Sequence, residues 1–235
     1  IALADIIFPY IRLSNPEFQR VLTWMRGQVI SEDEVTGKLK TKGVFTDVCA
    51  TVGGLDFHFG TGGIHACVPS QVVRADAETM IRDIDVAGLY PAIAIVNRLY
   101  PEHLGEKFVF EYAELPKERA KYKKGTPRSN AFKLAANATY GNSGNEHSIF
   151  YDPRLTMAIT VNGQLMLAML VEFLLSVESV RILQANTDGV TYTIRRDMLP
   201  RAQEVERAWE AYTRLVLEDV EYSAMWIRDC NTYIA

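Results

Sequence analysis

Apolar residues at helical spacing predict three helices that pack into a core. The first follows Asn15-Pro16-Glu17, a sequence typical of a helix start. Its apolar stripe consists of Phe18, Val21, Leu22 and Met25. A long apolar segment at 155–180 predicts a buried helix, and residues 200–217 predict an amphipathic one. The apolar side of that last helix consists of Val205, Ala208, Trp209, Tyr212 and Leu215.

Between residues 43 and 75 the pattern changes to short β-type segments separated by glycines. The expected strands are VFTDVCATV, LDFHF, GIHACV and QVVRA, with breaks at Gly53-Gly54, Gly60 and Gly62-Gly63. His58 and His65 have no partner motif, so we interpret them as core or surface side chains and not as ligands. The polar segment 31–40 is predicted to be a loop.

Two aspartates are expected at the ends of strands. Residues 80–86 predict a strand that ends beside Asp85, after which a short apolar helix begins at Pro91. Proline suits a first helical turn because its missing N–H would have no partner there. Residues 180–194 predict a β-hairpin with Asp188-Gly189 at its tip, because glycine tolerates a positive φ. Taken alone, Asp85 fits a solvated strand end and Asp188 fits a turn.

Two helices joined by a very short loop are predicted for residues 106–145. The only dense basic run consists of Lys117, Arg119, Lys121, Lys123, Lys124 and Arg128, a pattern usual for a solvated helix face. Thr126-Pro127 is a typical start for the second helix. On that helix Lys133, Asn137 and Tyr140 fall on one stripe. An amine, an amide and a phenol on one stripe favour a helix that faces a nucleotide.

Composition limits the classes of protein that fit. With 235 residues the chain forms one large domain or two small ones, and 48% hydrophobic residues suffice for a core. A net charge of −4 means that nucleic-acid binding would need a local basic patch. The cysteines Cys49, Cys67 and Cys230 have no zinc-site spacing and are interpreted as reduced, buried thiols of an intracellular protein.

The termini and the apolar runs give no targeting sequence. The N-terminal IALADIIFPYIRL lacks a basic region and a cleavage site, so we expect no signal peptide. The longest apolar run, 165–175, contains Glu172 and is too short to span a bilayer. The chain starts without Met, which suggests a fragment or a trimmed chain.

Three stretches resemble, in order, the motifs of family B DNA polymerases. Asp85 with Leu89-Tyr90-Pro91 resembles the first palm motif, Asp-x-x-Ser-Leu-Tyr-Pro. KLAANATYG, residues 133–141, resembles the fingers motif Lys-x-x-x-Asn-Ser-x-Tyr-Gly, with Ala138 replacing Ser. Residues 186–189, Asn-Thr-Asp-Gly, resemble the hairpin motif Asp-Thr-Asp-Ser, with an amide replacing the first carboxylate. The resemblance covers residues from about 55 to 235, with about 100 residues between the two aspartates.

The resemblance implies an α+β fold: a polymerase palm, in which helices back a mainly antiparallel sheet, with a short two-helix fingers insertion. Residues 1–105 would form the N-terminal segment and the first part of the palm, 106–145 compact fingers, and 146–235 the second part of the palm. The thumb and the exonuclease would be absent from this chain. Phage-type replication enzymes are the nearest in character.

The resemblance also assigns roles to individual residues. Asp85 and Asp188 would be catalytic and, with Val86, would hold two Mg²⁺ ions, or Mn²⁺ as an alternative. Asn186 and Thr187 belong to the hairpin. The nucleotide-binding residues would be Tyr90 under the incoming sugar, Arg119, Lys123 and Lys133 at the phosphates, and Asn137 and Tyr140. The DNA contacts would be Gly62, Gly63, Gly141 and Tyr233, with Gly60 where the family has Tyr and Asn231 where it has Lys.

The implied function is template-directed transfer of nucleotides from dNTP to a primer 3′-OH during DNA replication. The partners would be primer–template DNA and dNTP, with no membrane, and the missing exonuclease and thumb regions or replication accessory proteins are further candidates. The expected location is the cytoplasm of a phage-infected or prophage-bearing bacterial host. A catalytically degenerate, polymerase-like DNA-binding module is the alternative, which Asn186 and the missing thumb favour. An RNA-templated polymerase is a further rival, against which the KLAANATYG stretch argues.

Overall fold

The computed structural model describes residues 1–31 and 43–235, and it has an α+β fold in which every pair of neighbouring strands is antiparallel. The predicted loop at 31–40 lies, apart from Ser31, outside the described residues. The larger sheet has the order β1 (Cys49–Val52), β2 (Leu55–Phe59), β3 (Ile64–Cys67), β6 (Arg181–Asn186), β7 (Gly189–Arg195), β5 (Thr79–Val86), β8 (Leu217–Tyr222). The smaller sheet consists of β10 (Thr232–Ile234), β9 (Ala224–Asp229) and β4 (Gln71–Arg74).

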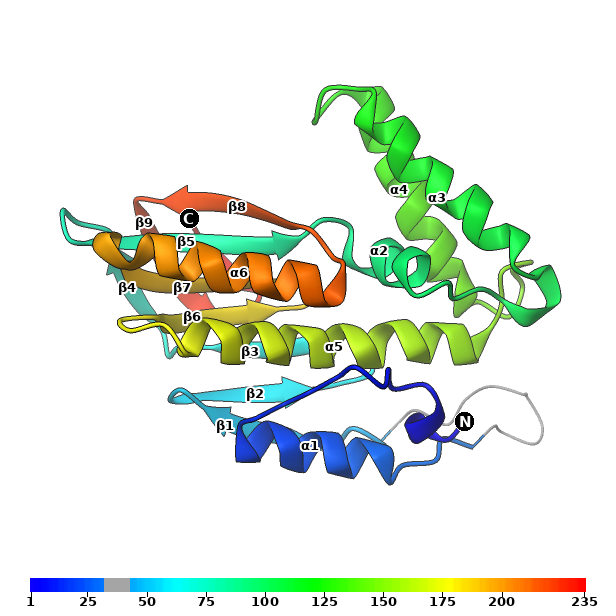
Figure 1. Cartoon of the computed structure of the whole chain (residues 1–235), viewed down its shortest axis with the longest axis horizontal. Coiled ribbons are helices and arrows are strands. Elements are labelled where there is room, and N and C mark those ends of the chain that lie inside the picture. Colours follow the sequence, from blue (N-terminus) through cyan, green and yellow to red (C-terminus); the bar gives the residue numbers. More distant parts are fainter. Residues whose placement is uncertain (32–42) are drawn as a thin grey trace.

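Helices cover one face of the larger sheet, and a helical pair projects from one end of it (Figure 1). The covering helices are α5 (Pro153–Leu175) and α6 (Leu199–Thr213), while α1 (Pro16–Arg26) packs against β1. The projecting pair is α3 (Lys107–Ala120) and α4 (Pro127–Ser143), and α2 (Leu89–Val96) contacts both of its helices and α5. The α+β class and the predicted helix-backed antiparallel sheet are therefore confirmed.

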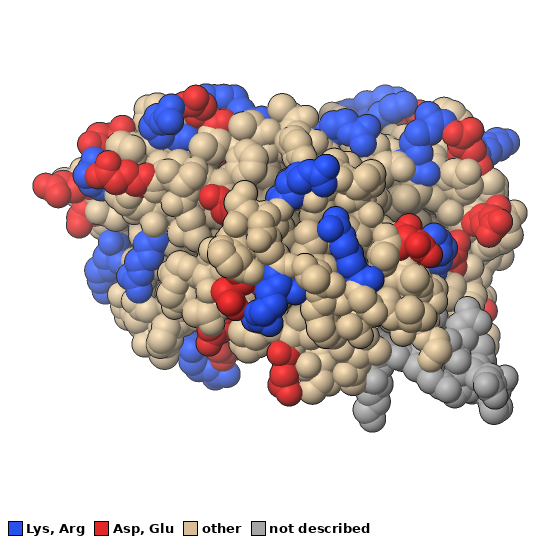
Figure 2. Space-filling model, turned by 60° about the horizontal axis from the view of Figure 1, so that its bottom comes forward, with Lys and Arg blue, Asp and Glu red and all other residues tan. Residues whose placement is uncertain are grey.

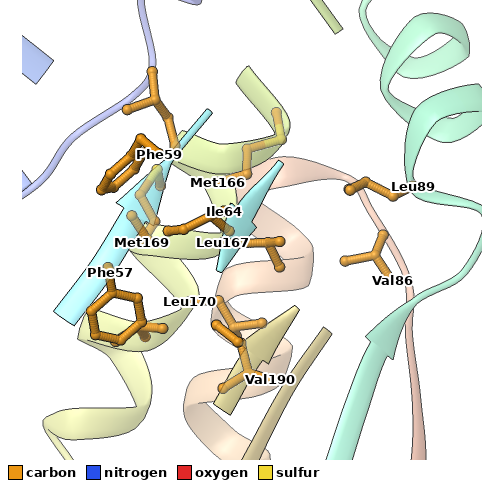
Figure 3. Packing of buried hydrophobic residues seen from close by; sticks show 14 of the residues in the cluster. Phe57, Phe59, Ile64, Val86, Leu89, Met166, Leu167, Met169, Leu170 and Val190 are labelled. Atoms are coloured by element: carbon orange, nitrogen blue, oxygen red, sulfur yellow. The ribbon is translucent and has the colours of Figure 1, made fainter. Parts of the chain in front are cut away.

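Helix α5 forms the centre of the core. The Asp152 side chain accepts a hydrogen bond from Leu155 N (2.9 Å) and Pro153 occupies the first turn, so the sequence fixes where the helix begins. Figure 3 shows Met166, Leu167 and Leu170 packed among β2, β3 and β7 side chains. Burying each such side chain contributes about 1.5–3 kcal/mol. The helix is long and apolar enough to cross a membrane, but 83% of its most apolar window is buried inside the protein.

Several predicted boundaries are wrong by a few residues. The first strand begins at Cys49, because residues 43–47 form turns. Helix α2 begins at Leu89 and not at Pro91, since Gly88 at φ +59° turns the chain directly from β5 into the helix. The buried helix ends at Leu175, five residues before the predicted end. The cysteines are unpaired as predicted, but each is only half-buried.

The largest error concerns residues 214–222, which were expected to end a helix and enter the last strand. Arg214 adopts φ +63°, which ends α6, and β8 follows beside β5. The buried side of α6 is formed by Ala202, Glu206, Trp209 and Thr213, whereas Ala208 and Tyr212 are exposed. The predicted final strand is two strands, β9 and β10, joined by a turn at Cys230.

A buried ion pair joins α6 to the larger sheet. Arg82 of β5 donates to Glu206 Oε2 (3.0 Å), and Tyr192 of β7 donates to Glu206 Oε1 (2.6 Å). Arg82 also lies 3.4 Å from Asp219, whose side chain is largely exposed. Burial of both charges means that either partner left alone would be an uncompensated ion inside the protein.

We expect Glu206→Ala to lower the free energy of unfolding by about 3–5 kcal/mol, because it leaves the Arg82 guanidinium buried without its main partner. Urea denaturation measures the change. Glu221→Ala is the matched control: it removes the exposed Arg196–Glu221 pair and should cost less than about 1 kcal/mol. Equal losses in the two variants would contradict a structural role for the buried pair.

Candidate active site

Strand pairing aligns residues from five strands in one row across the larger sheet, and all but Gly189 are polar. Glu218 and Gly189 are the two cross-strand partners of Asp85, and Asn186 continues the row beyond Gly189 to His65. Arg82 points to α6, and side chains alternate along a strand. Asp85 therefore points to the face of the sheet that α5 and α6 leave uncovered.

The two aspartates are brought together by an unusually close approach at Gly189. A Cβ on this residue would lie 1.7 Å from Asp85 Oδ1, so the carboxylate occupies the space that any larger side chain would need. Val86 N donates to Asp188 O (2.8 Å), which fixes the tip of the β6–β7 hairpin beside the end of β5. The prediction that Gly189 supplies a positive φ is wrong: the residue is needed because it has no side chain.

The positive φ of the hairpin lies instead at Thr187, at +59°. Asp188 N donates to Asn186 O (2.6 Å), a three-residue turn that is strained for a β-branched residue. Thr187 N donates to Ile64 O (3.1 Å), and Thr187 Oγ1 lies 3.4 Å from His65 Nε2. Strand β3 thus holds the hairpin tip, and His65 has a partner that the sequence did not indicate.

Asn186 has a structural use for its amide. Its Nδ2 donates to Cys230 O (3.1 Å) in the turn between β9 and β10, and its Oδ1 accepts from Thr187 Oγ1 (3.2 Å). A carboxylate cannot donate to a carbonyl. The amide therefore joins the hairpin to the C-terminal strands, a contact that an ionised aspartate at this position could not make.

Most of the predicted site residues line a cavity of about 500 Å³ between the sheet and α4. It is lined by Asp85, Val86, Tyr90, Arg119, Lys133, Asn137, Tyr140, Gly141 and Asp188, together with Gly88, Leu89, Lys124 and Glu218. A second cavity of about 230 Å³ shares the two aspartates. It is lined by Asp83, Gln184, Asn186, Thr187, Gly189, Thr191 and Tyr233 in addition to them.

Two tyrosines form one wall of the larger cavity. The rings of Tyr90 and Tyr140 are stacked, with 4.3 Å between their centroids and 28° between their planes. The Tyr90 hydroxyl donates to Gly62 O (2.6 Å), and Gly63 packs against Thr187. The predicted glycine pair therefore lies at the edge of the same site.

Lys123 is not among the residues that line the cavity, and Lys124 is. The prediction of Lys123 assumed helical spacing from Arg119, but α3 ends at Ala120, so that spacing no longer applies. The Lys123 carbonyl accepts from Thr126 N (3.2 Å) and Thr126 Oγ1 (2.8 Å), which sets the turn into α4. Lys124 Nζ reaches across to Glu218 (2.8 Å).

The two aspartates form no salt bridge within the described residues, whereas Glu218 pairs with Lys124. Burial raises the pKa of Asp85 from 3.8 to about 6, with further repulsion from Asp83, Asp188 and Glu218 and partial relief from Lys124. Burial also raises the pKa of Asp188, against which its own backbone N–H and Lys133 act. By contrast, the hydrogen bond from Lys124 lowers the pKa of Glu218.

The two carboxylates fit a hard divalent cation. Carboxylate and carbonyl oxygens are the donors that Mg²⁺ prefers, and the repulsion that raises the pKa of Asp85 is relieved by a cation. Among residues 1–31 and 43–235, no group of three or more His, Cys, Asp or Glu side chains is placed to hold a metal ion. Mg²⁺ commonly takes one or two carboxylates and completes its shell with water and phosphate oxygens, so two suffice here.

Sequence reasoning missed several polar residues that line the two cavities: Asp83, Lys124, Gln184, Thr191 and Glu218. Asp83 could have been found, because it shares its strand and its face with Asp85 at a spacing of two. Its carboxylate accepts from Thr191 Oγ1 (2.6 Å) and Tyr222 OH (2.9 Å). Glu218 was hidden because β8 was not predicted.

No protein-family model and no curated protein sequence matches this chain. What can be inferred about its function therefore comes from the motifs and from the geometry above.

Replacing Asp85 by the isosteric Asn should stabilise the protein above pH 6. A raised carboxyl pKa means that the folded state favours the protonated form. The contribution of Asp85 to folding stability is therefore fully present below about pH 4 and is lost as the pH rises through about 6. The gain in unfolding free energy at pH 8 should stay below about 1 kcal/mol, because the Asp85 side chain, although partly desolvated by its neighbours, remains open to screening by solvent. It should vanish near pH 3.5.

Urea denaturation at several pH values measures this dependence, with Asp76→Asn as a control of opposite sign. The pKa of Asp76 is lowered, chiefly by hydrogen bonds from the backbone N–H groups of Thr79 and Glu78. Its stabilising contribution is present above about pH 4 and is lost in acid. Asp76→Asn should therefore destabilise the protein at pH 8, and a gain there would contradict the electrostatic account.

Proposed function

We propose that the chain is the palm and fingers part of a DNA-directed DNA polymerase, which transfers nucleotides from dNTP to the 3′-OH of a primer. One observation carries the proposal: a single cavity joins two paired carboxylates, three basic side chains and a stacked tyrosine pair. These groups come from β5, the β6–β7 hairpin and the α2–α4 helices, the places where the three resembling motifs lie.

Two Mg²⁺ ions, or Mn²⁺ in their place, would activate the primer hydroxyl and neutralise charge on the triphosphate. Asp85, Asp188 and the Val86 carbonyl are the groups of this chain that would hold them. Their positions are set before any ligand binds, because the Asp85–Gly189 approach and the Val86–Asp188 hydrogen bond fix both strand ends. Such preorganisation spares the reaction the cost of ordering the site.

The cationic side chains of the cavity fit a triphosphate. Arg119 and Lys124 come from α3 and the turn after it, and Lys133 comes from the facing side of α4. A triphosphate between the two helices would meet positive charge from both. Glu218 pairs with Lys124 in the ligand-free protein, so phosphate oxygens would replace this carboxylate as the partner of Lys124.

The stacked tyrosines fit the nucleoside part of the substrate. Tyr90 is held from both sides, by the Tyr140 ring and by its hydrogen bond to Gly62 O, so the ring has little freedom to move away from a bulkier sugar. A fixed ring beneath the sugar would reject an added 2′-OH by steric conflict. Asn137 and Gly141 lie on the same side of α4, where an incoming base and the template would pass.

The alternative is a polymerase-shaped module that binds DNA without catalysis. Part of its support was the amide at Asn186, for which the hydrogen bond from its Nδ2 to Cys230 O offers a structural reason. Both aspartates that the two-ion reaction needs are present and adjacent. We therefore favour the enzyme, and by its resemblance to phage-type enzymes we place it in the cytoplasm of a phage-infected or prophage-bearing bacterium.

A primer-extension assay with Mg²⁺ tests the proposal. Asp85→Asn and Asp188→Asn should each lower kcat by at least about a thousandfold, because each removes a charge that the cations need. DNA affinity should change little, since basic groups that contact phosphate dominate it. Asp219→Asn, on the neighbouring strand β8, is the control and should keep wild-type activity. Stoichiometric DNA binding without Mg²⁺-dependent extension by the wild type would establish the alternative.

Lys124 and Lys123 allow a matched comparison. Lys124 lines the cavity in the structure, whereas Lys123 is the lysine that the motif spacing predicted. Lys124→Ala should raise the KM for dNTP about tenfold, because it removes one charge from the triphosphate side of the cavity. Lys123→Ala removes the same charge one residue away and should leave the KM within about twofold. Steady-state extension on one primer–template measures both. A larger increase in KM for Lys123→Ala than for Lys124→Ala would favour the prediction from helical spacing, in which Lys123 binds the phosphates.

A further inference from the structure

The outer face of the smaller sheet carries an exposed apolar row. Trp226 of β9 lies between Val72 of β4 and Ile234 of β10 as their direct cross-strand partner. Directly opposed residues of an antiparallel pair point to the same face. Their exposed fractions are 44% for Trp226, 51% for Val72 and 71% for Ile234. Such a row is unusual on an otherwise polar surface.

Arginines surround this row. The Arg74 guanidinium lies over the Trp226 ring, 5.3 Å from its centroid. Arg228 lies two residues after Trp226 on the same strand and therefore on the same face. Within the described residues, Arg74 has no acidic partner, while Arg228 pairs with Asp229. The Arg74 guanidinium thus gives the row an unpaired positive charge.

A hollow of about 390 Å³ lies beside the row. It is lined by residues of all three strands, among them Val72, Trp226, Arg228 and Tyr233. Tyr233 also lines the smaller cavity that contains Asp85 and Asp188. The same tyrosine thus borders both spaces, so the hollow and that cavity are neighbours.

We propose that this face binds a single-stranded segment of nucleic acid, with one unpaired base stacked on Trp226 and the flanking phosphates at Arg74 and Arg228. An aromatic ring accepts any base face, and a stacked guanidinium keeps its N–H donors free for a phosphate. A protein partner with an apolar surface would cover the row, but it would bury the Arg74 guanidinium without a counter-ion, which is costly. The charge therefore favours a polyanion.

This inference rests on the proposed function only for the identity of the strand, primer or template, that passes the active site. Binding itself needs neither Mg²⁺ nor dNTP. It can be measured in EDTA with a short oligothymidylate, so that a failure of binding at this face and a failure of primer extension are separate results.

Tryptophan fluorescence gives the direct test, because Trp226 is the most exposed of the three tryptophans Trp24, Trp209 and Trp226. We expect oligothymidylate to quench the emission, and Trp226→Phe to remove most of the quenching while keeping affinity within about threefold. Trp226→Ala should weaken binding about tenfold, since it removes one stacking ring. Trp24→Phe, on α1, is the control and should leave quenching and affinity unchanged.

Salt dependence tests the phosphate contacts. Arg74→Ala should lower the slope of log K against log salt concentration by about 0.7, the value for one phosphate contact on a single strand. Arg26→Ala on α1 removes an equal charge elsewhere and should leave the slope unchanged.

Full quenching in Trp226→Phe, or unchanged affinity in Trp226→Ala, would overturn the proposal. Binding of an apolar peptide, but not of oligothymidylate, to this face would also overturn it. Circular dichroism of each variant confirms that it is folded, and the phenylalanine variant keeps an aromatic ring in the row.

Discussion

The Asp85 carboxylate lies where any residue larger than glycine at 189 would place its Cβ, 1.7 Å from Asp85 Oδ1. This contact sets the register between β5 and β7, because a shift of one residue would put a side chain into the carboxylate or turn Asp85 toward α6. The hairpin tip must then lie beside Val86, where Asp188 O accepts its hydrogen bond. The close approach of Asp85 to Gly189 thus places the two aspartates next to each other and sets the position of the cavity around them.

Strand β5 serves the core and the site at once. Arg82 reaches Glu206 of α6 on one face, while Asp83 and Asp85 point to the other. The buried pair holds the strand on the side of α6, and the open face carries carboxylates: burial, and then repulsion between them, raises the pKa of Asp85. The strained Thr187 adds a further cost of about 1–3 kcal/mol. The apolar packing of α5 offsets these costs, and the core reaches the site through Val86 and Leu89, which are buried in it and also line the larger cavity.

The sequence predicted what local patterns determine, and it missed what strand pairing determines. The α5 helix, the β6–β7 hairpin and the α4 start at Thr126 were predictable because caps, periodicity and turns lie within short windows. Strand β8 was not, since its residues are exposed, with no alternation of polar and apolar positions, and Glu218 was lost with it. Lys124 was missed because helical spacing was extended past the end of α3. The need for glycine at 189 comes from its contact with Asp85 of a different strand, which no local sequence pattern reveals.

An acidic chain can still bind a polyanion if its positive charges lie where the polyanion passes. Figure 2 shows acidic and basic side chains interspersed over the face that it presents, so a net charge of −4 produces no single strong field. Screening limits exposed charges to about 8 Å at physiological ionic strength, and distant acidic residues therefore repel a bound strand only weakly. What matters is the sign of the charge where the strand would lie. Positive side chains lie on one side of the carboxylates, at Arg119, Lys124 and Lys133, and on the other, around Trp226. Affinity built on few such contacts should depend on salt less steeply than that of a strongly basic protein, which leaves positioning at the carboxylates to short-range geometry.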